Sequence, residues 1–260
     1  MPLIEIRNVV KNYGAIPVLR GLSLDVKEHQ AVCLIGPSGC GKSTLLRCIN
    51  GLEPINGGDI CLHGDRVSGA GVDVNALRRD VGIVFQSFNL FPHMSVIDNI
   101  TLAPMRVLGQ TCDEAEVRAM ALLKRIGLDH KARDYPDRLS GGQQQRVAIV
   151  RALAMEPIVL LLDEITSALD PELVSEVLNI VRDLIGDGMT MILATHEIAL
   201  PGKWRARSAF YTRVWCTRRG HPSRCFRSLQ RNGRKRFWRG LWRREGCERR
   251  QMPEKIGKVT

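Results

Sequence analysis

The chain has 260 residues and a mass of 29.1 kDa, with 44% hydrophobic and 25% charged residues, which is typical of a globular protein. This composition excludes collagen-like, low-complexity and wholly disordered chains, and the longest apolar stretch is far shorter than the roughly 18 to 20 residues of a membrane-spanning helix. The start of the chain has no apolar signal-peptide region, so we expect a cytosolic protein. The eight cysteines include no C-x-x-C pair, which predicts reduced thiols.

The net charge of +11 is unevenly distributed along the chain. Residues 1–200 hold 19 Lys and Arg against 24 Asp and Glu, a net charge of −5, whereas residues 201–260 hold 19 against 3, a net charge of +16. All four tryptophans also lie in the second segment. We therefore expect an ordered domain over residues 1–200 and a basic tail, residues 201–260, that is irregular and poorly ordered.

The order of the expected elements indicates an α/β fold. Strands alternate with helices in the manner of a parallel sheet covered by helices on both faces, after a β-rich start. The middle of the chain, residues 87–155, has helical periodicity and predicts a helical lobe. We expect strands at 3–6, 18–26, 31–36, 159–163 and 189–196, β structure over 57–85, and helices over 95–127, after 140 and from 171.

The strongest local motif is GPSGCGKST, which follows an apolar strand and opens a helix. It matches G-x-x-x-x-G-K-[ST], in which glycines let backbone N–H groups point at phosphate oxygens. The Lys42 ammonium would reach the β and γ phosphates, and the Ser43 hydroxyl would bind Mg²⁺. The alternative is a glycine-rich turn without a nucleotide. The predicted phosphate loop consists of Gly36, Pro37, Ser38, Gly39, Cys40, Gly41, Lys42, Ser43 and Thr44.

Two further motifs carry charge or anion-binding groups. The strand IVLLLDE delivers Asp163 and Glu164 to its carboxyl end, where we predict that Asp163 binds Mg²⁺ and Glu164 polarises an attacking water. An acidic pair at this position could instead cap the next helix. The segment LSGGQ forms a second anion-binding helix start, which suggests contact with a partner's nucleotide. Its residues are Ser140, Gly141, Gly142 and Gln143.

Together these residues resemble the ATP-binding subunits of ABC transporters, whose motif order is present throughout residues 1–200. The resemblance implies a P-loop ATPase cassette with an N-terminal antiparallel β subdomain, binding ATP and Mg²⁺ in a head-to-tail homodimer. It also implies four further roles: Tyr13 stacks on adenine, Gln86 lies near Mg²⁺ and water, Asp170 faces the partner cassette, and His196 contacts the γ-phosphate. Taken alone, a tyrosine or histidine at such a position is more often an ordinary structural residue, and the assignment of Tyr13 and His196 depends on the full ordered set of motifs.

Several segments are similar in sequence to the ATPases of bacterial polar amino acid uptake systems. Among them are VFQSFNLFPHMSVIDNI and SALDPELVSEVL. This resemblance implies a peripheral subunit on the cytoplasmic face of the membrane. Its partners would be permease subunits and, indirectly, an extracytoplasmic solute-binding protein. The sequence departs from the family at Ile165, where proline is usual, at Val150, where alanine is usual, and at His29 and Gln30, where Gly-Glu is usual.

The basic tail does not match the family. Read one base earlier, the segment VWCTRRGHPSRCF can encode VVHEEGAPEQVF and KRFWR can encode EAFLA, which resemble the missing family C-terminus; we interpret this as a one-base frameshift near Leu200. Alternatives are an arm for nucleic acid or anionic membrane, and a metal site of Cys216, His221 and Cys225.

Two rival functions stand beside the importer ATPase. One is a soluble ABC-type ATPase that acts on nucleic acid through the tail, although such relatives usually carry two cassettes or a long insertion after Gln86. The other is a nucleotide-binding regulator without turnover.

Overall fold

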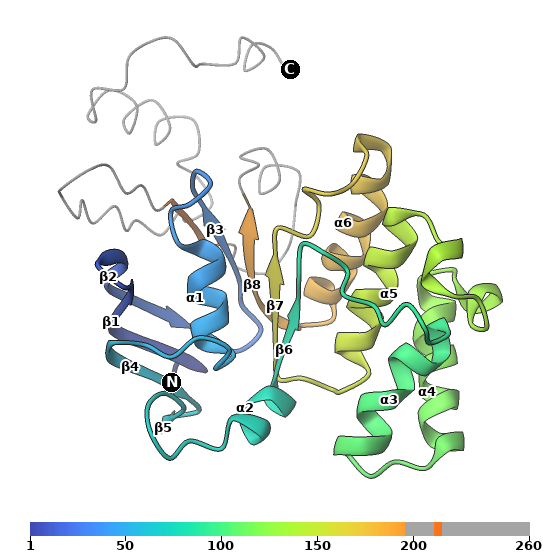
Figure 1. The fold of residues 1–260 in the computed structure, drawn as a ribbon, viewed down its shortest axis with the longest axis horizontal. Helices are drawn as coiled ribbons and strands as arrows, with labels where there is room; N and C mark the ends of the chain where they lie inside the picture. Colours follow the sequence, from blue (N-terminus) through green and yellow to red (C-terminus); the bar gives the residue numbers. More distant parts are fainter. Residues whose placement is uncertain (196–210, 215–260) are drawn as a thin grey trace, which may run out of the picture. The chain divides into compact units, whose positions relative to one another are not determined.

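The structure is a computed structural model that describes residues 1–195 and 211–214, and their strands form two sheets (Figure 1). The antiparallel sheet has the order β2-β1-β4-β5, with bounds Ile16–Val26, Ile4–Tyr13, Gly57–Leu62 and Asp65–Arg66. The parallel sheet has the order β6-β7-β8-β3-β9, with bounds Val81–Val84, Val159–Asp163, Thr190–Thr195, Ala31–Ile35 and Tyr211–Val214. No helix in the described part is both long and apolar enough to cross a bilayer.

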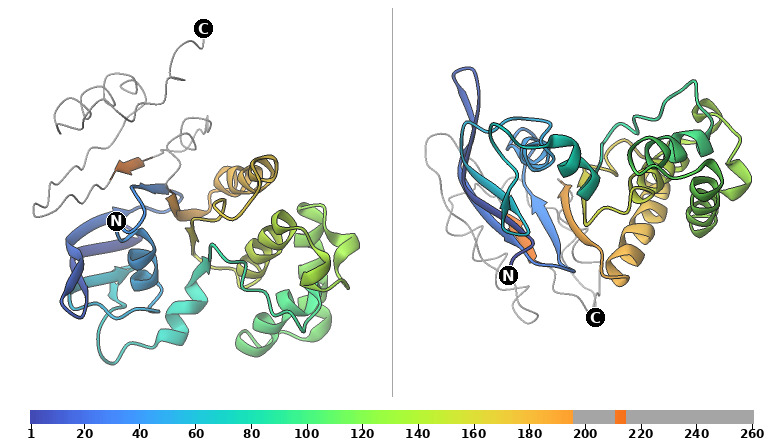
Figure 2. Two further views of the ribbon diagram at one scale, coloured as in Figure 1. Left: turned by 45° about the horizontal axis from the view of Figure 1, so that its top comes forward. Right: turned by 90° about the horizontal axis from the view of Figure 1, so that it is seen from below.

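Helices cover both faces of the parallel sheet. Their bounds are Lys42–Ile49 for α1, Val74–Asp80 for α2, Val96–Val107 for α3, Cys112–Arg125 for α4, Gly141–Leu153 for α5 and Pro171–Gly186 for α6. Figure 2 shows the antiparallel sheet beyond α1 on one side and helices α3 to α5 as a separate lobe on the other. The predicted α/β fold, with its parallel core, N-terminal antiparallel subdomain and helical lobe, is confirmed.

Helix α1 is held between the two sheets. Its apolar side chains Leu45, Leu46 and Ile49 pack in one buried cluster with residues of β1, β2 and β4 on one side and of β3, β7 and β8 on the other. Alternate residues of the parallel strands point to the opposite face, where α5 and α6 form a second cluster. Because both faces are covered, every residue of β3, β7 and β8 is buried.

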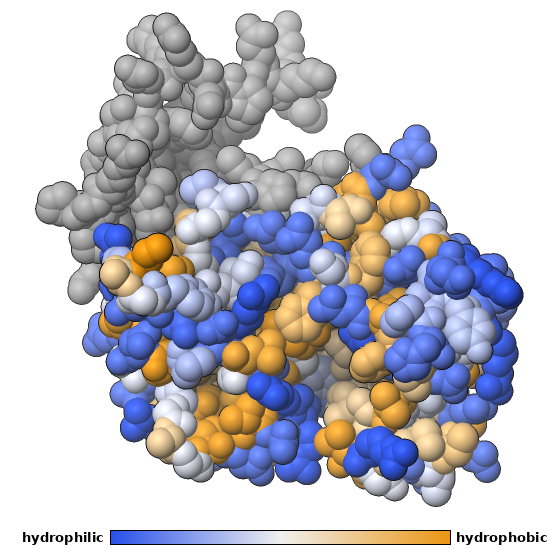
Figure 3. Space-filling model, viewed as in Figure 1, coloured by the Kyte–Doolittle hydropathy of each residue, from blue (hydrophilic) through white to orange (hydrophobic). Residues whose placement is uncertain are grey.

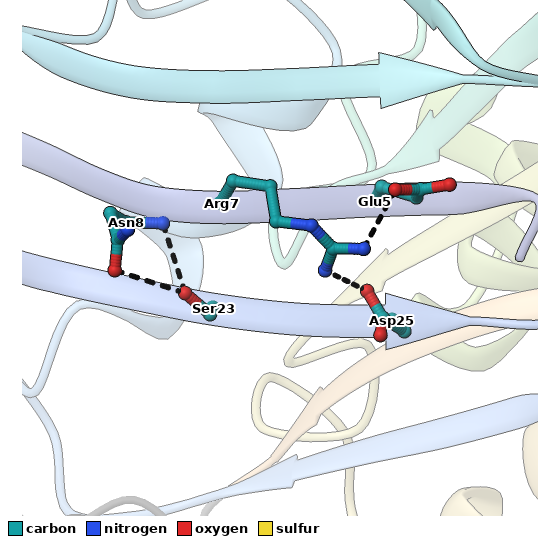
Figure 4. A network of polar contacts seen from close by, with 5 residues as sticks. All are labelled: Glu5, Arg7, Asn8, Ser23 and Asp25. Carbon is teal, nitrogen blue, oxygen red and sulfur yellow. Dashed lines mark hydrogen bonds and ion pairs between the residues drawn. The ribbon is translucent and has the colours of Figure 1, made fainter.

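The antiparallel sheet contains a bulge at Asn8, where the register between β1 and β2 shifts between Ile6 and Val9. Asn8 has a φ of +47°, and its N–H donates to Ser23 Oγ at 2.9 Å. On the same face, the Arg7 guanidinium pairs with Glu5 at 2.7 Å and with Asp25 (Figure 4). These ion pairs are exposed and add little stability, so they do not explain the bulge.

The structure differs from the sequence-based elements in three places. The helix expected over 95–127 is divided into α3 and α4, with Gly109 at a φ of +70° between them and the Thr111 side chain capping α4. The β structure expected over 57–85 includes α2, which starts because the Asp73 carboxylate accepts the N–H groups of Asn75 and Ala76. The basic tail was expected to be irregular, yet four of its residues form β9, which pairs in parallel with β3.

We predict that Gly58 is required by the bulge. A Cβ at this position would lie 2.4 Å from the carbonyl oxygens of Arg7 and Asn8, and the φ of Gly58 is +80°. Gly58→Ala should therefore lower the free energy of unfolding by about 3 kcal/mol. Gly64→Ala is the matched control, since Gly64 has a φ of +91° and open space around it, and should cost only about 1 kcal/mol of backbone strain. Equal losses in denaturant unfolding would contradict this explanation.

Candidate nucleotide-binding site

The predicted site residues meet at one edge of the parallel sheet. Strand β3 leads into the phosphate loop, β7 ends at Asp163, and Gln86 is exposed two residues beyond the end of β6. Because these strands are parallel, their carboxyl ends lie on the same side. The described structure therefore brings three of the predicted motifs together although they are far apart in the sequence.

The phosphate loop is shaped by glycines and ends in an uncapped helix. Gly39 and Gly41 have φ values of +77° and +96°, which the glycine backbone adopts without strain. Gly41 is the N-cap of α1 and supplies no side chain to bind the first N–H groups of that helix. Within the loop Pro37, Ser38 and Gly39 are exposed. The helix start can thus receive an anion, as the motif predicts.

The Lys42 ammonium is buried among oxygen atoms. Its side chain is 3% exposed, and Nζ lies 3.0 Å from the Gly36 carbonyl oxygen, 3.2 Å from that of Pro37 and 3.1 Å from Glu164 Oε1. A buried charge needs such partners because it has lost its water. This ion pair joins the phosphate loop to the end of β7.

Asp163 is paired with Ser43, the second residue of α1. Ser43 Oγ donates to Asp163 Oδ1 at 2.7 Å, and Asp163 is buried. Burial raises the pKa of the Asp163 carboxyl, and the charge of Glu164 acts in the same direction. The Ser43 hydrogen bond and the positive charges of Arg47 and Lys42 lower that pKa. The result is a buried carboxylate that would gain from a cation beside it.

Glu164 has a strained backbone that its neighbours hold in place. Its φ of +48° is uncommon for a residue with a side chain. Its N–H donates to the Ala194 carbonyl at 3.0 Å, and its own carbonyl accepts from the N–H and the hydroxyl of Ser167. Ile165, at the position where the family usually has proline, is buried in the core under α6. The Ser167 bonds and this burial fix the turn that presents the Glu164 carboxylate.

The LSGGQ segment starts helix α5 with a capping box. Ser140 Oγ accepts the Gln143 N–H at 3.3 Å, while Gln143 Oε1 accepts the Ser140 N–H at 2.9 Å. Gly142 packs against α6, because a Cβ there would lie 3.0 Å from Leu173 Cβ. Ser140 is exposed, so the helix start is accessible to a partner.

The remaining predicted residues lie in different surroundings. Tyr13 ends β1 with 43% of its surface exposed, and Asp170 is exposed directly before α6. His196 follows β8 directly in the sequence but lies outside the described residues, as do Cys216, His221 and Cys225.

Sequence reasoning missed the charges that support these residues. Arg47, one turn after Ser43 on α1, acts on Asp163, and Lys11 lies over the Tyr13 ring. The sequence held a signal for each. Arg47 is four residues after Ser43, the spacing that brings side chains to one face of a helix, and Lys11 is two residues before Tyr13, the spacing that brings them to one face of a strand. A separate hollow of about 720 Å³ lies between residues 62 and 80, beside β5 and α2, and none of the predicted site residues lines it.

Comparisons with known proteins agree with this geometry. A family model described as "ABC transporter" matches residues 19–167, which spans the phosphate loop, LSGGQ, Asp163 and Glu164. The chain belongs to the ABC transporter family. The glutamine transport ATP-binding protein GlnQ of Escherichia coli is 48% identical over 220 residues, covering 85% of this chain and 92% of that protein. The arginine transport ATP-binding protein ArgV of Corynebacterium glutamicum is 53% identical, covering 75% of this chain and 81% of that protein.

Solved ABC structures have the same fold as this ABC chain. The ATP-binding cassette MJ0796, described as dimeric in a post-hydrolysis state bound to ADP and Pi, has a TM-score of 0.75 and 32% identity, covering 88% of this chain and 99% of its own. CbiO1 of Clostridium perfringens, part of the ABC transporter complex CbiONQ, has a TM-score of 0.72 and 30% identity, covering 81% of this chain and 84% of its own. The predicted family and fold are thereby confirmed.

We predict that Asp163 lowers the stability of the nucleotide-free protein at neutral pH. Because folding raises the pKa of the Asp163 carboxyl, the folded chain binds this proton more tightly than the unfolded chain does. Proton binding therefore stabilises the folded chain at low pH, and this stabilisation is lost as the pH rises through the folded pKa. Asp163→Asn, which keeps an acceptor for Ser43, should raise Tm at pH 7 by about 1–3 °C. The gain should shrink below about pH 4, where an unfolded aspartate is also protonated.

Thermal unfolding by circular dichroism measures this difference. Asp183→Asn on the exposed side of α6 is the control and should leave Tm within about 1 °C. A fall in Tm for Asp163→Asn at pH 7 would show that Ser43, Arg47 and Lys42 outweigh the cost of burial.

Proposed function

We propose that this chain is the ATP-hydrolysing subunit of an importer for a polar amino acid. The observation that carries the proposal is the set of pairs at the sheet edge, Lys42 with Glu164 and Ser43 with Asp163. In this proposal the Lys42 ammonium binds phosphates, and the two carboxylates beside it have separate tasks, one toward the metal and one toward the attacking water. The class of solute is supported by the relatives, which are named as transport proteins for glutamine, for arginine, and for glutamate and aspartate.

The residues present fit Mg²⁺. Ser43 and Asp163 would supply two oxygen ligands, which lie 2.7 Å apart. Gln86 follows the end of β6, the strand that pairs with β7. Mg²⁺ prefers oxygen ligands and usually binds through one or two carboxylates together with substrate phosphates. When bound, the metal would neutralise charge on the phosphate oxygens.

Hydrolysis in this proposal begins with a change of partner for Lys42. The β and γ phosphates of ATP take the place of Glu164 at the ammonium, and the Glu164 carboxylate is released to orient a water and accept its proton. The water oxygen bonds to the γ-phosphorus as the bond to the bridging oxygen breaks, which gives ADP and phosphate. His196 would contact the same phosphate.

A second cassette would complete the site. The capped but exposed start of α5 would bind the γ-phosphate held by the partner's phosphate loop. Tyr13 would stack on the adenine, and Asp170 would face the partner cassette. The dimeric structures of MJ0796 support this arrangement. Closure on ATP and reopening after product release would then drive the transporter.

In this proposal the solute passes through other proteins, and this chain supplies the ATP hydrolysis. We propose that permease subunits bind the helical lobe, so that the chain is peripheral at the cytoplasmic face, and that a solute-binding protein delivers the amino acid. Apolar residues gather between the lobe and the rest of the face shown in Figure 3. The lobe and the loop before it also expose large apolar side chains that a protein partner could cover. They are Phe91, Met105, Val107, Leu108, Val117 and Met120.

The nucleic-acid function is not proposed. It depended on the basic tail, of which the structure describes only Tyr211–Val214, and the relatives named above are transport proteins. The regulator without turnover is distinguished from the proposed ATPase by a direct test of the water-polarising residue.

We predict that Glu164→Gln lowers the ATP hydrolysis rate at least 100-fold while ATP still binds. The amide keeps the shape of the side chain but accepts no proton, so it removes general-base assistance of about this size. Phosphate release measures turnover, and equilibrium dialysis with labelled ATP measures binding. Glu172→Gln, at an exposed carboxylate on α6, is the matched control and should retain the wild-type rate. An unchanged rate in Glu164→Gln would remove the catalytic assignment.

A further inference from the structure

Tyr13 does not stand alone at the end of β1. The Lys11 ammonium lies over its ring, 4.8 Å from the ring centroid, because residues two apart on a strand point to the same face. A cation over an aromatic face is attracted by the negative charge of that face. The ring is nevertheless 43% exposed, so part of its surface remains open to a ligand.

Lys11 is an unusually buried lysine for a surface strand. Its side chain is only 7% exposed, and Nζ donates to the Pro54 carbonyl oxygen at 2.8 Å and pairs with Glu53 Oε2 at 2.9 Å. Burying a flexible, strongly hydrated ammonium is costly, and it is tolerated where oxygen partners replace the lost water. The tyrosine ring closes the remaining side of this small polar site.

Glu53 joins the lysine and the tyrosine. Hydrogen bonding from Lys11 lowers the pKa of the Glu53 carboxyl, and the positive charge of Lys11 and the hydrogen bond from the Tyr13 hydroxyl act in the same direction. Tyr13 thus has the Lys11 ammonium over one face of its ring, and the Glu53 carboxylate holds that ammonium in place. A fixed cation over one face restrains the half-exposed ring.

This arrangement also ties the ring to the helix that starts in the phosphate loop. Glu53 and Pro54 follow α1 closely, and their backbone folds back on that helix through bonds from the Leu52 and Glu53 N–H groups to the Arg47 carbonyl, at 2.9 and 3.1 Å. The Lys11 ammonium therefore connects the end of β1 to the last turn of α1. Lys42 and Ser43 lie in the first turn of the same helix.

We propose that Lys11, with Glu53, is a positioning residue for nucleotide-base recognition. It covers one face of the Tyr13 ring, restrains the ring in a single orientation, and leaves the exposed face for the adenine. The inference rests on the proposed nucleotide site and extends it to residues that contact no nucleotide. Preorganising a side chain saves the entropy that binding would otherwise cost, about 0.5–1.5 kcal/mol for each immobilised side chain.

The test separates base binding from phosphate binding. The full-length chain and its variants are titrated calorimetrically with ATP and, separately, with inorganic tripolyphosphate, both in EDTA so that no hydrolysis occurs. Lys11→Met keeps the length of the side chain and removes its charge. We expect it to weaken ATP binding about three- to tenfold and to change tripolyphosphate binding less than twofold.

Two conservative variants show whether the site still folds. Lys11→Arg retains a cation over the ring and should bind ATP within about twofold of wild type. Tyr13→Phe retains the ring and the cation but removes the hydroxyl, and should weaken ATP binding less than Lys11→Met does. Equal weakening of ATP and tripolyphosphate in Lys11→Met would reveal a merely structural role and overturn the proposal.

Tyr13→Ala distinguishes failure of this inference from failure of the nucleotide site. If Tyr13→Ala weakens ATP binding and Lys11→Met does not, the positioning role is wrong and the adenine contact stands. If Tyr13→Ala leaves ATP binding unchanged, the adenine contact is wrong and the positioning role falls with it. Lys42→Ala should weaken both ligands in either case, because it removes the phosphate partner itself.

Discussion

A buried ammonium that must be surrounded by oxygen atoms is the constraint on which this site depends. Lys42 is withdrawn from water, and carbonyl oxygens of the phosphate loop and the Glu164 carboxylate take the place of the lost water around its ammonium. The carboxylate comes from a strand two places away in the sheet, since β8 lies between β3 and β7. The loop, the strand order and the turn at Glu164 must therefore all be correct for the lysine to be accommodated.

The layers of the fold meet this constraint. Helix α1 is packed between two sheets, so its first turn has little freedom to move away from the sheet edge. From there Ser43 reaches Asp163, and Arg47 adds positive charge one turn later. In the absence of ligands the site balances its charges internally. Phosphates and a cation can each replace one of these internal partners, which makes binding of the two mutually favourable.

Local patterns in the sequence were sufficient for the phosphate loop, the carboxylates at the end of β7 and the capped start of α5. Each depends on residues within about ten positions of one another, and each has a mechanism that short spacing reveals. The pairs Ser43 with Asp163 and Lys11 with Glu53 join residues 120 and 42 positions apart. Nothing in their local sequence identifies the partner, so only the assembled sheets and α1 show them.

Departures from local preference were also invisible in the sequence. His29 stands where the family usually has glycine and still adopts a φ of +57°, because its N–H donates to Thr190 Oγ1 and its ring bonds to the Gly188 carbonyl oxygen. Tyr211–Val214 lies in a segment with basic, non-family composition, yet it pairs along β3. In both cases contacts distant in sequence decide the conformation. The one-base shift near Leu200 stays a hypothesis for the whole of residues 201–260.

The measurement that tests the central claim most directly is calorimetric unfolding of the full-length chain with a non-hydrolysable ATP analogue, with Mg²⁺, and with both. If the analogue's phosphates replace Glu164 at Lys42 and the cation replaces the Ser43 proton at Asp163, the two ligands together should raise Tm by more than the sum of their separate effects. At about one hundred times the dissociation constant the combined rise should be about 5–10 °C. An additive response, or no response to the analogue, would contradict a single coupled site at Lys42, Asp163 and Glu164.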